Sequence, residues 1–169
     1  MASKVVRLLK HRWLDEKDSQ RVLPPDLLER LASRVAASEK RHSGEIRICV
    51  EAGLPASYIW GGLHARDRAV MMFSKLRVWD TEQNSGVLIY LLLAEHSIEL
   101  VADRGLNRFV NPAEWKAMVD HLSDKLRAGD YEAGLTLALE EVSAVLVRHF
   151  PLAPGQADSN ELPDAPVVI

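Results

Sequence analysis

Oxygen-bearing side chains precede or end two apolar segments of the chain. The polar loop 77–86 runs into the apolar run 87–94, and a second largely apolar run, 97–103, follows. If the two runs pair as an antiparallel hairpin, the start of the first lies beside the end of the second. One edge of the predicted sheet, which we call the acidic rim, then carries Asp80, Glu82, Asn84 and Asp103.

The acidic rim has the donor types that a hard divalent cation prefers. Calcium and magnesium take carboxylate, amide and carbonyl oxygens as ligands. The sequence therefore predicts a site for Ca²⁺ or Mg²⁺, formed by the four side chains named above. The competing interpretation is a pair of solvated salt bridges, Asp80 with Arg77 and Asp103 with Arg104, which would contribute little stability.

One function that such a rim suits is metal-assisted hydrolysis of a phosphoester. Asp80, Asp103 and Asn84 would hold the ion, which polarises the phosphoryl group and lowers the pKa of a bound water. Guanidinium groups would neutralise phosphate oxygens in a forked geometry. The candidates for this phosphate-binding role are Arg66, Arg68 and Arg104.

The other function is a non-catalytic binding or accessory module that uses the same rim as its recognition surface. The chain has no GxSxG, no HExxH and no phosphate-cradling glycine loop. We therefore assign no catalytic residue and favour the binding module. Its partner would be an unidentified protein or a small phosphorylated ligand.

Composition excludes several classes of protein. The 169 residues suit one domain. With 21 basic and 24 acidic residues the net charge is −3, which gives no field to recruit nucleic acid. Cys49 is the lone cysteine, so no internal disulfide forms, and we expect it to pack within a strand. Bases interrupt the apolar positions of 1–17, unlike a secretory signal, and we expect a cytoplasmic protein.

The periodicity of apolar residues predicts an α/β fold. Helical spacing over 23–42 and 57–76 flanks a strand at 45–52, in which apolar and polar residues alternate. Strand, helix and strand in this order make a βαβ crossover, to which the antiparallel hairpin adds. Two helices that follow residue 111, separated at Gly129, make a C-terminal αα hairpin. We predict a three-layer α/β/α sandwich with a small mixed β-sheet.

The two ends of the chain differ from the central predicted domain, 21–150. Residues 1–20 comprise a basic amphipathic helix and a linker, and the apolar side of the helix carries Val5, Val6, Leu9 and Trp13. We expect this helix to pack on its own domain and do not expect membrane contact, although a basic amphipathic helix can also touch an acidic membrane surface. Residues 151–169 hold four of the eight prolines, three acids and no base, which predicts a disordered acidic tail.

Several short strings resemble the TPM-domain family, whose name joins thylakoid-lumen phosphatase-like proteins, a photosystem II repair protein and a nematode receptor modulator. The general strings are GVLIYLL at 86–92, the pair Gly105 and Leu106, and RAGDYEAGL at 127–135. Four further strings resemble a short cytosolic branch of this family that is found in bacteria. They are ARDRA at 65–69, VWDTE at 78–82, ELVADRG at 99–105 and HFP at 149–151.

The resemblance covers residues 24–150 and implies an α/β/α layered sheet with the acidic rim at one end. It also implies a divalent-cation pocket, because related domains are described as binding calcium or similar ions and some as acid phosphatases. Where the family commonly has Asp-Asn-Gly before the strand, this chain has Asn84, Ser85 and Gly86, so one expected carboxylate is missing. The signal peptide, C-terminal membrane helix and glycine-rich tail of many members are not expected here.

Overall fold

A mixed four-stranded sheet in the order β3-β2-β1-β4 forms the centre of the molecule. The computed structural model describes residues 4–14, 16–156 and 159–169; residues 1–3, 15 and 157–158 of the predicted ends lie outside this description. The strands are β1 (Ile46–Glu51), β2 (Val87–Leu92), β3 (Ser97–Ala102) and β4 (Val167–Val168). The α-helices are α1 (Lys4–Trp13), α2 (Glu16–Val22), α3 (Pro25–Glu39), α4 (Ala56–Trp60), α5 (Ala65–Lys75), α6 (Pro112–Arg127) and α7 (Tyr131–His149), and short 3₁₀ turns are η1 (Leu93–Glu95) and η2 (Leu106–Arg108).

The strand pairing confirms the predicted βαβ crossover and hairpin. β1 and β2 are parallel, with Ile46 opposite Val87, and β2 and β3 are antiparallel, with Val87 opposite Ala102. The hairpin turns through η1 and His96, which adopts the left-handed conformation at φ 48°. This register brings the start of β2 beside the end of β3, as the acidic rim requires.

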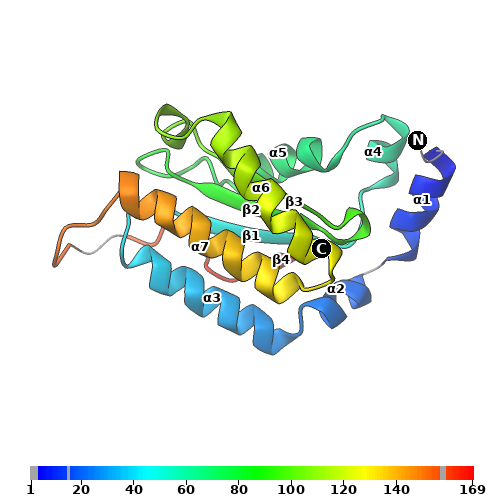
Figure 1. Ribbon diagram of the computed structural model, residues 1–169, viewed down its shortest axis with the longest axis horizontal. Helices are drawn as coiled ribbons and strands as arrows, with labels where there is room; N and C mark the ends of the chain where they lie inside the picture. The colour runs from blue at the N-terminus through cyan, green and yellow to red at the C-terminus, as the bar shows by residue number, and fades with distance from the viewer. Residues whose placement is uncertain (1–3, 15, 157–158) are drawn as a thin grey trace.

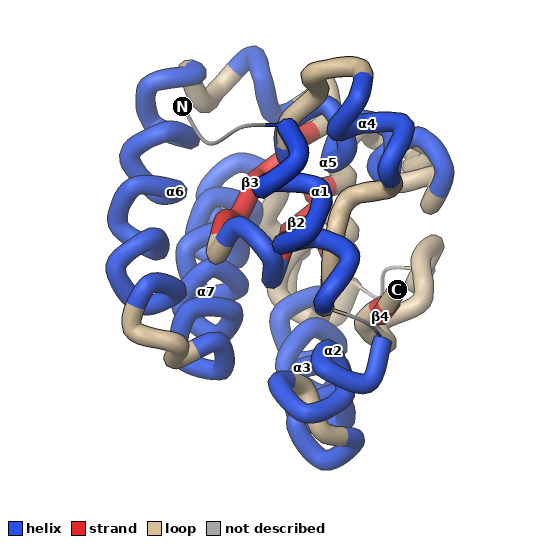
Figure 2. The backbone as a smooth tube through the Cα atoms, turned by 90° about the vertical axis from the view of Figure 1, so that its right-hand side faces the viewer, coloured by secondary structure: helices blue, strands red, loops and turns tan. Residues whose placement is uncertain are grey.

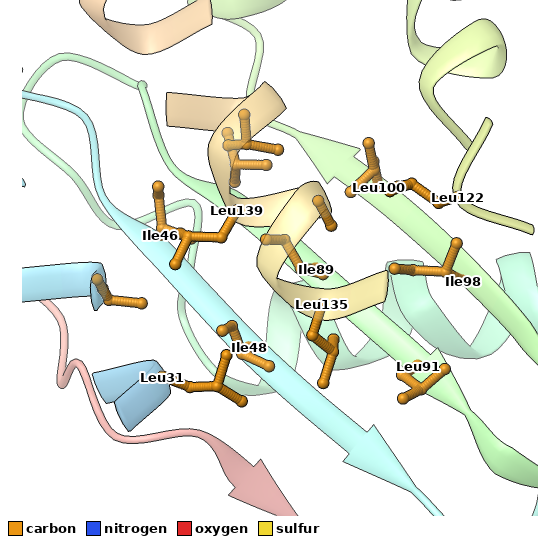
Figure 3. Close-up of a cluster of buried hydrophobic side chains, with 14 of the residues drawn as sticks. Leu31, Ile46, Ile48, Ile89, Leu91, Ile98, Leu100, Leu122, Leu135 and Leu139 are labelled. Carbon is orange, nitrogen blue, oxygen red and sulfur yellow. The ribbon is translucent and has the colours of Figure 1, made fainter. Parts of the chain in front are cut away.

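Helices cover both faces of the sheet, which confirms the three-layer sandwich (Figures 1 and 2). Ile48, Ile89 and Leu100 face the layer formed by α3, α6 and α7 (Figure 3). The alternate positions, including Cys49 and Tyr90, face the layer that contains α4 and α5. Cys49 is fully buried, and burial raises the pKa of its thiol to about 12, so it is a packing residue as predicted.

The single helix predicted over 57–76 is two helices in the structure. α4 ends at Trp60 and α5 begins at Ala65. Gly62 lies between them with φ +71°, a conformation that glycine adopts at little cost and that a helix cannot contain. The new helix is capped by Asp67, whose carboxylate accepts a hydrogen bond from the His64 N–H at 2.8 Å.

Helix α1 packs on the domain as predicted, but its apolar side faces away from the domain. Val5, Val6, Leu9 and Trp13 are 55%, 56%, 51% and 83% exposed. The opposite side contacts the body: Leu8 packs against the cluster that contains Leu54, and the buried His11 accepts a hydrogen bond at Nδ1 from the Leu54 N–H at 2.9 Å. Hydrogen bonds and this packing hold the helix, and an amphipathic pattern does not show which side they use. Within the described residues, no helix has the length and apolar character of a membrane span.

The C-terminal segment is ordered in its described part, contrary to the predicted disorder. β4 pairs in parallel with β1, and Leu162 is 7% exposed. The buried carboxylate of Glu45 accepts hydrogen bonds from the N–H groups of Glu161 and Leu162 at 3.0 and 3.1 Å. Arg47 donates to two carbonyls of the same segment. Arg47 of β1 and Glu45 just before it thus bind the backbone of the C-terminal segment. Composition does not reveal such a long-range interaction.

Candidate functional site

The acidic rim forms where β1 and β2 begin and β3 ends. The N–H of Asp103 donates to the carbonyl of Gly86 at 2.9 Å, which extends the β2–β3 ladder to the rim. The polar loop before β2 approaches so closely that a Cβ at Gly86 would collide with the Val78 carbonyl oxygen, and one at Gly105 with the Asn84 carbonyl oxygen. Both glycines are therefore needed to bring the loop against the end of β3.

Asp103 and Asn84 form the centre of the rim. Asp103 is only 8% exposed; its Oδ1 accepts a hydrogen bond from the Arg104 N–H at 2.6 Å. Its Oδ2 is buried and has no hydrogen-bond partner within the described part of the chain. The Nε of Arg104 donates to Oδ1 of Asn84 at 3.0 Å. A buried carboxylate oxygen is costly unless water, an ion or a ligand satisfies it.

The other two predicted ligands, Asp80 and Glu82, have different partners. The exposed Asp80 lies 3.7 Å from Nε of Arg77, as the salt-bridge interpretation expects. The N–H of Glu82 donates to the carboxylate of Glu161 at 3.0 Å. Among the described residues, no three Asp, Glu, His or Cys side chains gather closely enough to hold a metal ion. The structure thus links Asn84 to Asp103 through Arg104 but does not assemble all four predicted ligands.

The predicted phosphate-binding arginines are separated in the structure. Arg104 is at the rim, whereas Nη1 of Arg66 donates to the Leu100 carbonyl at 2.5 Å, in the middle of β3. Arg68 is buried against Glu51 at the far end of β1, with its guanidinium 5.3 Å from the centre of the Tyr58 ring. Burial alone would lower the pKa of Arg68, but its hydrogen bonds and attraction to Glu51 outweigh burial and raise it. Arg68 is therefore not placed to meet a ligand at the rim.

A family model described as the TPM domain matches residues 17–145, most of the chain. The chain belongs to the TPM-domain family. Two solved structures support this assignment at the level of the fold. The BA42 protein of the psychrophilic bacterium Bizionia argentinensis is 25% identical, with a TM-score of 0.73 over 86% of this chain and 94% of its own. The N-terminal domain of a P. gingivalis protein is 18% identical, with a TM-score of 0.63 over 78% and 83%. No curated protein matches the chain.

This TPM domain carries further acids that the sequence reasoning missed. Glu161 reaches the rim from the C-terminal segment, where no local pattern predicts its place. Glu39, Glu45 and Asp164 border a cavity of about 470 Å³ beside the start of β1. Burial, opposed by the hydrogen bond from the Ile46 N–H, and then the charges of Glu45 and Asp164 raise the pKa of Glu39 to about 8. Glu39 is thus largely protonated at neutral pH.

A larger cavity of about 660 Å³ lies beside β3, which is an edge strand of the TPM sheet. Apolar and charged side chains together line it. The lining comes from α5, from β3, from the segment before α6 and from α6 itself, and includes Arg66, Glu99, Leu100, Val110, Trp115 and Lys116. Because Lys116 and Arg66 already contact Asp120 and Glu99, the lining presents paired rather than net charge.

Proposed function

We propose that this TPM domain is a cytoplasmic, non-catalytic binding module whose acidic rim takes up a divalent cation as part of recognition. The observation that carries the proposal is the unpaired, buried Oδ2 of Asp103. An ionised oxygen in that position is stabilised by a cation or by an ordered water that a cation can replace. The neighbouring Asn84 supplies an amide oxygen, which it would share with Arg104.

The small number of rim oxygens favours magnesium over calcium. Calcium takes six to eight oxygen ligands, whereas magnesium keeps several of its waters and binds through one or two carboxylates. Asp103 and Asn84 therefore suit a hydrated Mg²⁺ better than a desolvated Ca²⁺. Asp80 and Glu82 would add negative charge near the ion without binding it directly.

The partner would complete the coordination sphere of the ion. Oxygens of an unidentified protein or of a small phosphorylated ligand can replace ion-bound waters, and Arg104 lies beside the same position. Nucleic acid remains an unsuitable partner because the net charge of the chain is −3.

Thermal unfolding with and without Mg²⁺ or Ca²⁺ tests the proposed site. A tenfold excess over Kd stabilises the folded state by about 1.4 kcal/mol, which raises Tm by roughly 3–6 °C. Asp103→Asn should abolish the shift while keeping an acceptor for the Arg104 N–H. Asp124→Asn is the matched control, because the side chain of Asp124 is 83% exposed on α6. An ion-induced shift that persists in Asp103→Asn would contradict the proposal.

Phosphoester hydrolysis is the second candidate, supported by the guanidinium of Arg104 beside Asn84, and by the backbone N–H of Arg104 on Asp103. In that case the ion would polarise a phosphoryl oxygen and Arg104 would neutralise a second one. Hydrolysis of a generic aryl phosphate by the wild type should then disappear in the Asp80→Asn, Asp103→Asn double variant. Turnover that is equal in both proteins would remove the rim from any catalytic role.

A further inference from the structure

The outward side of α1 is a continuous apolar surface. At 3.6 residues per turn, its four apolar side chains fall within one arc of about 100°. We call this surface the α1 arc; it consists of Val5, Val6, Leu9 and Trp13. Trp13, at 83% exposed, is the most accessible of these side chains. Figure 1 shows α1 at one end of the molecule.

Polar contacts hold the α1 arc in this outward orientation. Nη2 of Arg7 lies 2.7 Å from Oε1 of Glu95, and Nη1 of Arg7 donates to the Leu63 carbonyl at 2.8 Å. Nε2 of His11 lies 3.0 Å from the same Glu95 oxygen. Lys4 donates to the carbonyl of Trp60 at 3.2 Å. Turning the apolar side inward would break all of these contacts, so exposure of the arc is a property of the folded protein.

Basic residues border the α1 arc on both sides. The sequence of α1, KVVRLLKHRW, contains four bases besides its histidine and no acid. By helical spacing Lys10 follows one border of the arc and Arg12 the other, and both are exposed. An apolar surface with a cationic border complements a surface that is apolar inside and anionic outside.

We propose that α1 is a peripheral membrane-binding element that docks on anionic lipid. The α1 arc enters the boundary between headgroups and acyl chains, where the indole of Trp13 is favoured, and Lys10 and Arg12 meet lipid phosphates. No spanning helix is needed for this contact. The proposal is independent of the cation site at the rim. The sequence led us to expect no membrane contact because the helix would pack on its own domain; it does pack there, through the side opposite the arc, and the arc stays exposed.

Charge argues against a second copy of the chain as the occupant. Two α1 helices packed arc to arc would place Lys10 and Arg12 of one copy near the same bases of the other, with no acid on either helix. Like charges at such a contact are destabilising. An anionic lipid surface has the opposite charge and accepts a short helix without a groove.

Cosedimentation with vesicles tests the proposal. The full chain is mixed with vesicles of phosphatidylcholine and phosphatidylglycerol, or of phosphatidylcholine alone. Two bases near an anionic surface should make binding roughly 30-fold stronger on the mixed vesicles. Because salt screens exposed charges, this preference should shrink in 1 M salt, where the Debye length is about 3 Å.

Leu9→Glu and Trp13→Ala should each remove most of the vesicle-bound protein. Val70→Glu is the matched control, because Val70 is 48% exposed on α5, and it should bind like the wild type. Unchanged Tm values verify that the variants are folded. The proposal is overturned by absence of sedimentation, by equal binding to both vesicle types, or by loss of binding in Val70→Glu. It is also overturned if the wild type is a dimer that Leu9→Glu dissociates, since a second copy would then cover the arc.

Discussion

Glu51 and Arg68 form a two-point ion pair beneath α5. Nη2 and Nε of Arg68 lie 2.7 and 2.8 Å from the two carboxylate oxygens of Glu51, and the hydroxyl of Tyr90 donates to the second oxygen at 2.6 Å. The side chains of Arg68 and Glu51 are 11% and 6% exposed, respectively. The pair is therefore a structural link between β1, β2 and α5 rather than a ligand site.

Removing one member of this pair should be strongly destabilising. Arg68→Met leaves the Glu51 carboxylate buried without its counter-ion, which costs about 3–5 kcal/mol and lowers Tm by roughly 6–20 °C. Adding Glu51→Gln to Arg68→Met removes the buried charge and keeps an acceptor for Tyr90. The double variant should recover most of the loss in thermal unfolding. A double variant less stable than Arg68→Met would show that the unpaired charge of Glu51 is not the cause of the destabilisation.

The raised pKa of Glu39 predicts that stability falls as pH rises. The folded state binds this proton up to about pH 8, whereas the ordinary pKa of the group is 4.5. Between these values the unfolded state holds fewer protons, so the free energy of unfolding decreases with pH and levels off above pH 8. Because the carboxyl is only partly buried, we expect Glu39→Gln to stabilise the protein at pH 8.5 by about 2 kcal/mol.

Urea unfolding from pH 6.5 to pH 8.5 isolates the effect of Glu39. Burial lowers the pKa of folded His42 to about 4, whereas unfolded His42 still binds protons near its ordinary pKa of 6.5. His42 therefore raises stability slightly with pH at the lower end of this window, and it does so equally in all the proteins compared. The wild type should lose stability across the window, and Glu39→Gln should lose less. Glu29→Gln, an exposed change on the same helix, should follow the wild type. If the free energy of unfolding changed with pH in the same way in all three proteins, Glu39 would be excluded as the source of the pH dependence.

The contacts of Glu95 predict that a single substitution releases α1. Arg7 and His11 both bond to this carboxylate, so Glu95→Gln removes the ionic partner of Arg7 and weakens the acceptor for the Nε2–H of His11. Amide hydrogen exchange of residues 4–13 should accelerate by at least tenfold, while the strands keep their protection. Glu132→Gln, which alters an exposed ion pair with Arg30, is the control. Unchanged exchange in 4–13 would mean that α1 is held by contacts other than these.

The buried side chain of Leu162 predicts that the C-terminal segment stabilises the whole domain. Leu162 packs in the cluster that contains Leu88 and Tyr90. Leu162→Ala should cost about 2–3 kcal/mol through lost burial and a residual cavity. The expected fall in Tm is roughly 4–12 °C. Ala153→Gly, at an exposed position earlier in the same segment, is the control and should change Tm little. If Leu162→Ala also left Tm unchanged, the C-terminal segment would not contribute to the stability of the domain.

Local patterns were sufficient to predict the centre of the fold. The uninterrupted apolar run of β2, the alternation of β1 and the stop at Gly129 each depend on neighbouring residues, so the crossover, the hairpin and the αα pair could be derived. The proximity of Asp103 to the loop that carries Asn84 followed from the same hairpin. Asp80 could not be placed in this way, because the loop turns through left-handed Arg77 and Asn84.

The remaining features depend on contacts between residues far apart in the chain. The outward orientation of α1 is set by the bond between His11 and Glu95, and the order of the tail by the bonds of Glu45 to Glu161. A periodic pattern states which side chains share a side of a helix, but not which side the rest of the chain will cover. The composition of the tail likewise predicts weak intrinsic order, but composition does not show that residues at β1 bind the tail.

The position of Arg66 also bears on how copies of the protein behave at high concentration. The two-residue strand β4 forms one edge of the sheet, whereas the longer β3 forms the other edge and leaves its outer backbone groups unpaired by any other strand of the described chain. Such a strand is a template for association between molecules, leading toward aggregates. The guanidinium of Arg66 occupies the Leu100 carbonyl and sets a positive charge at the middle of that strand. A second copy would have to displace this guanidinium before it could pair with β3. Arg66 therefore opposes aggregation through strand pairing between molecules.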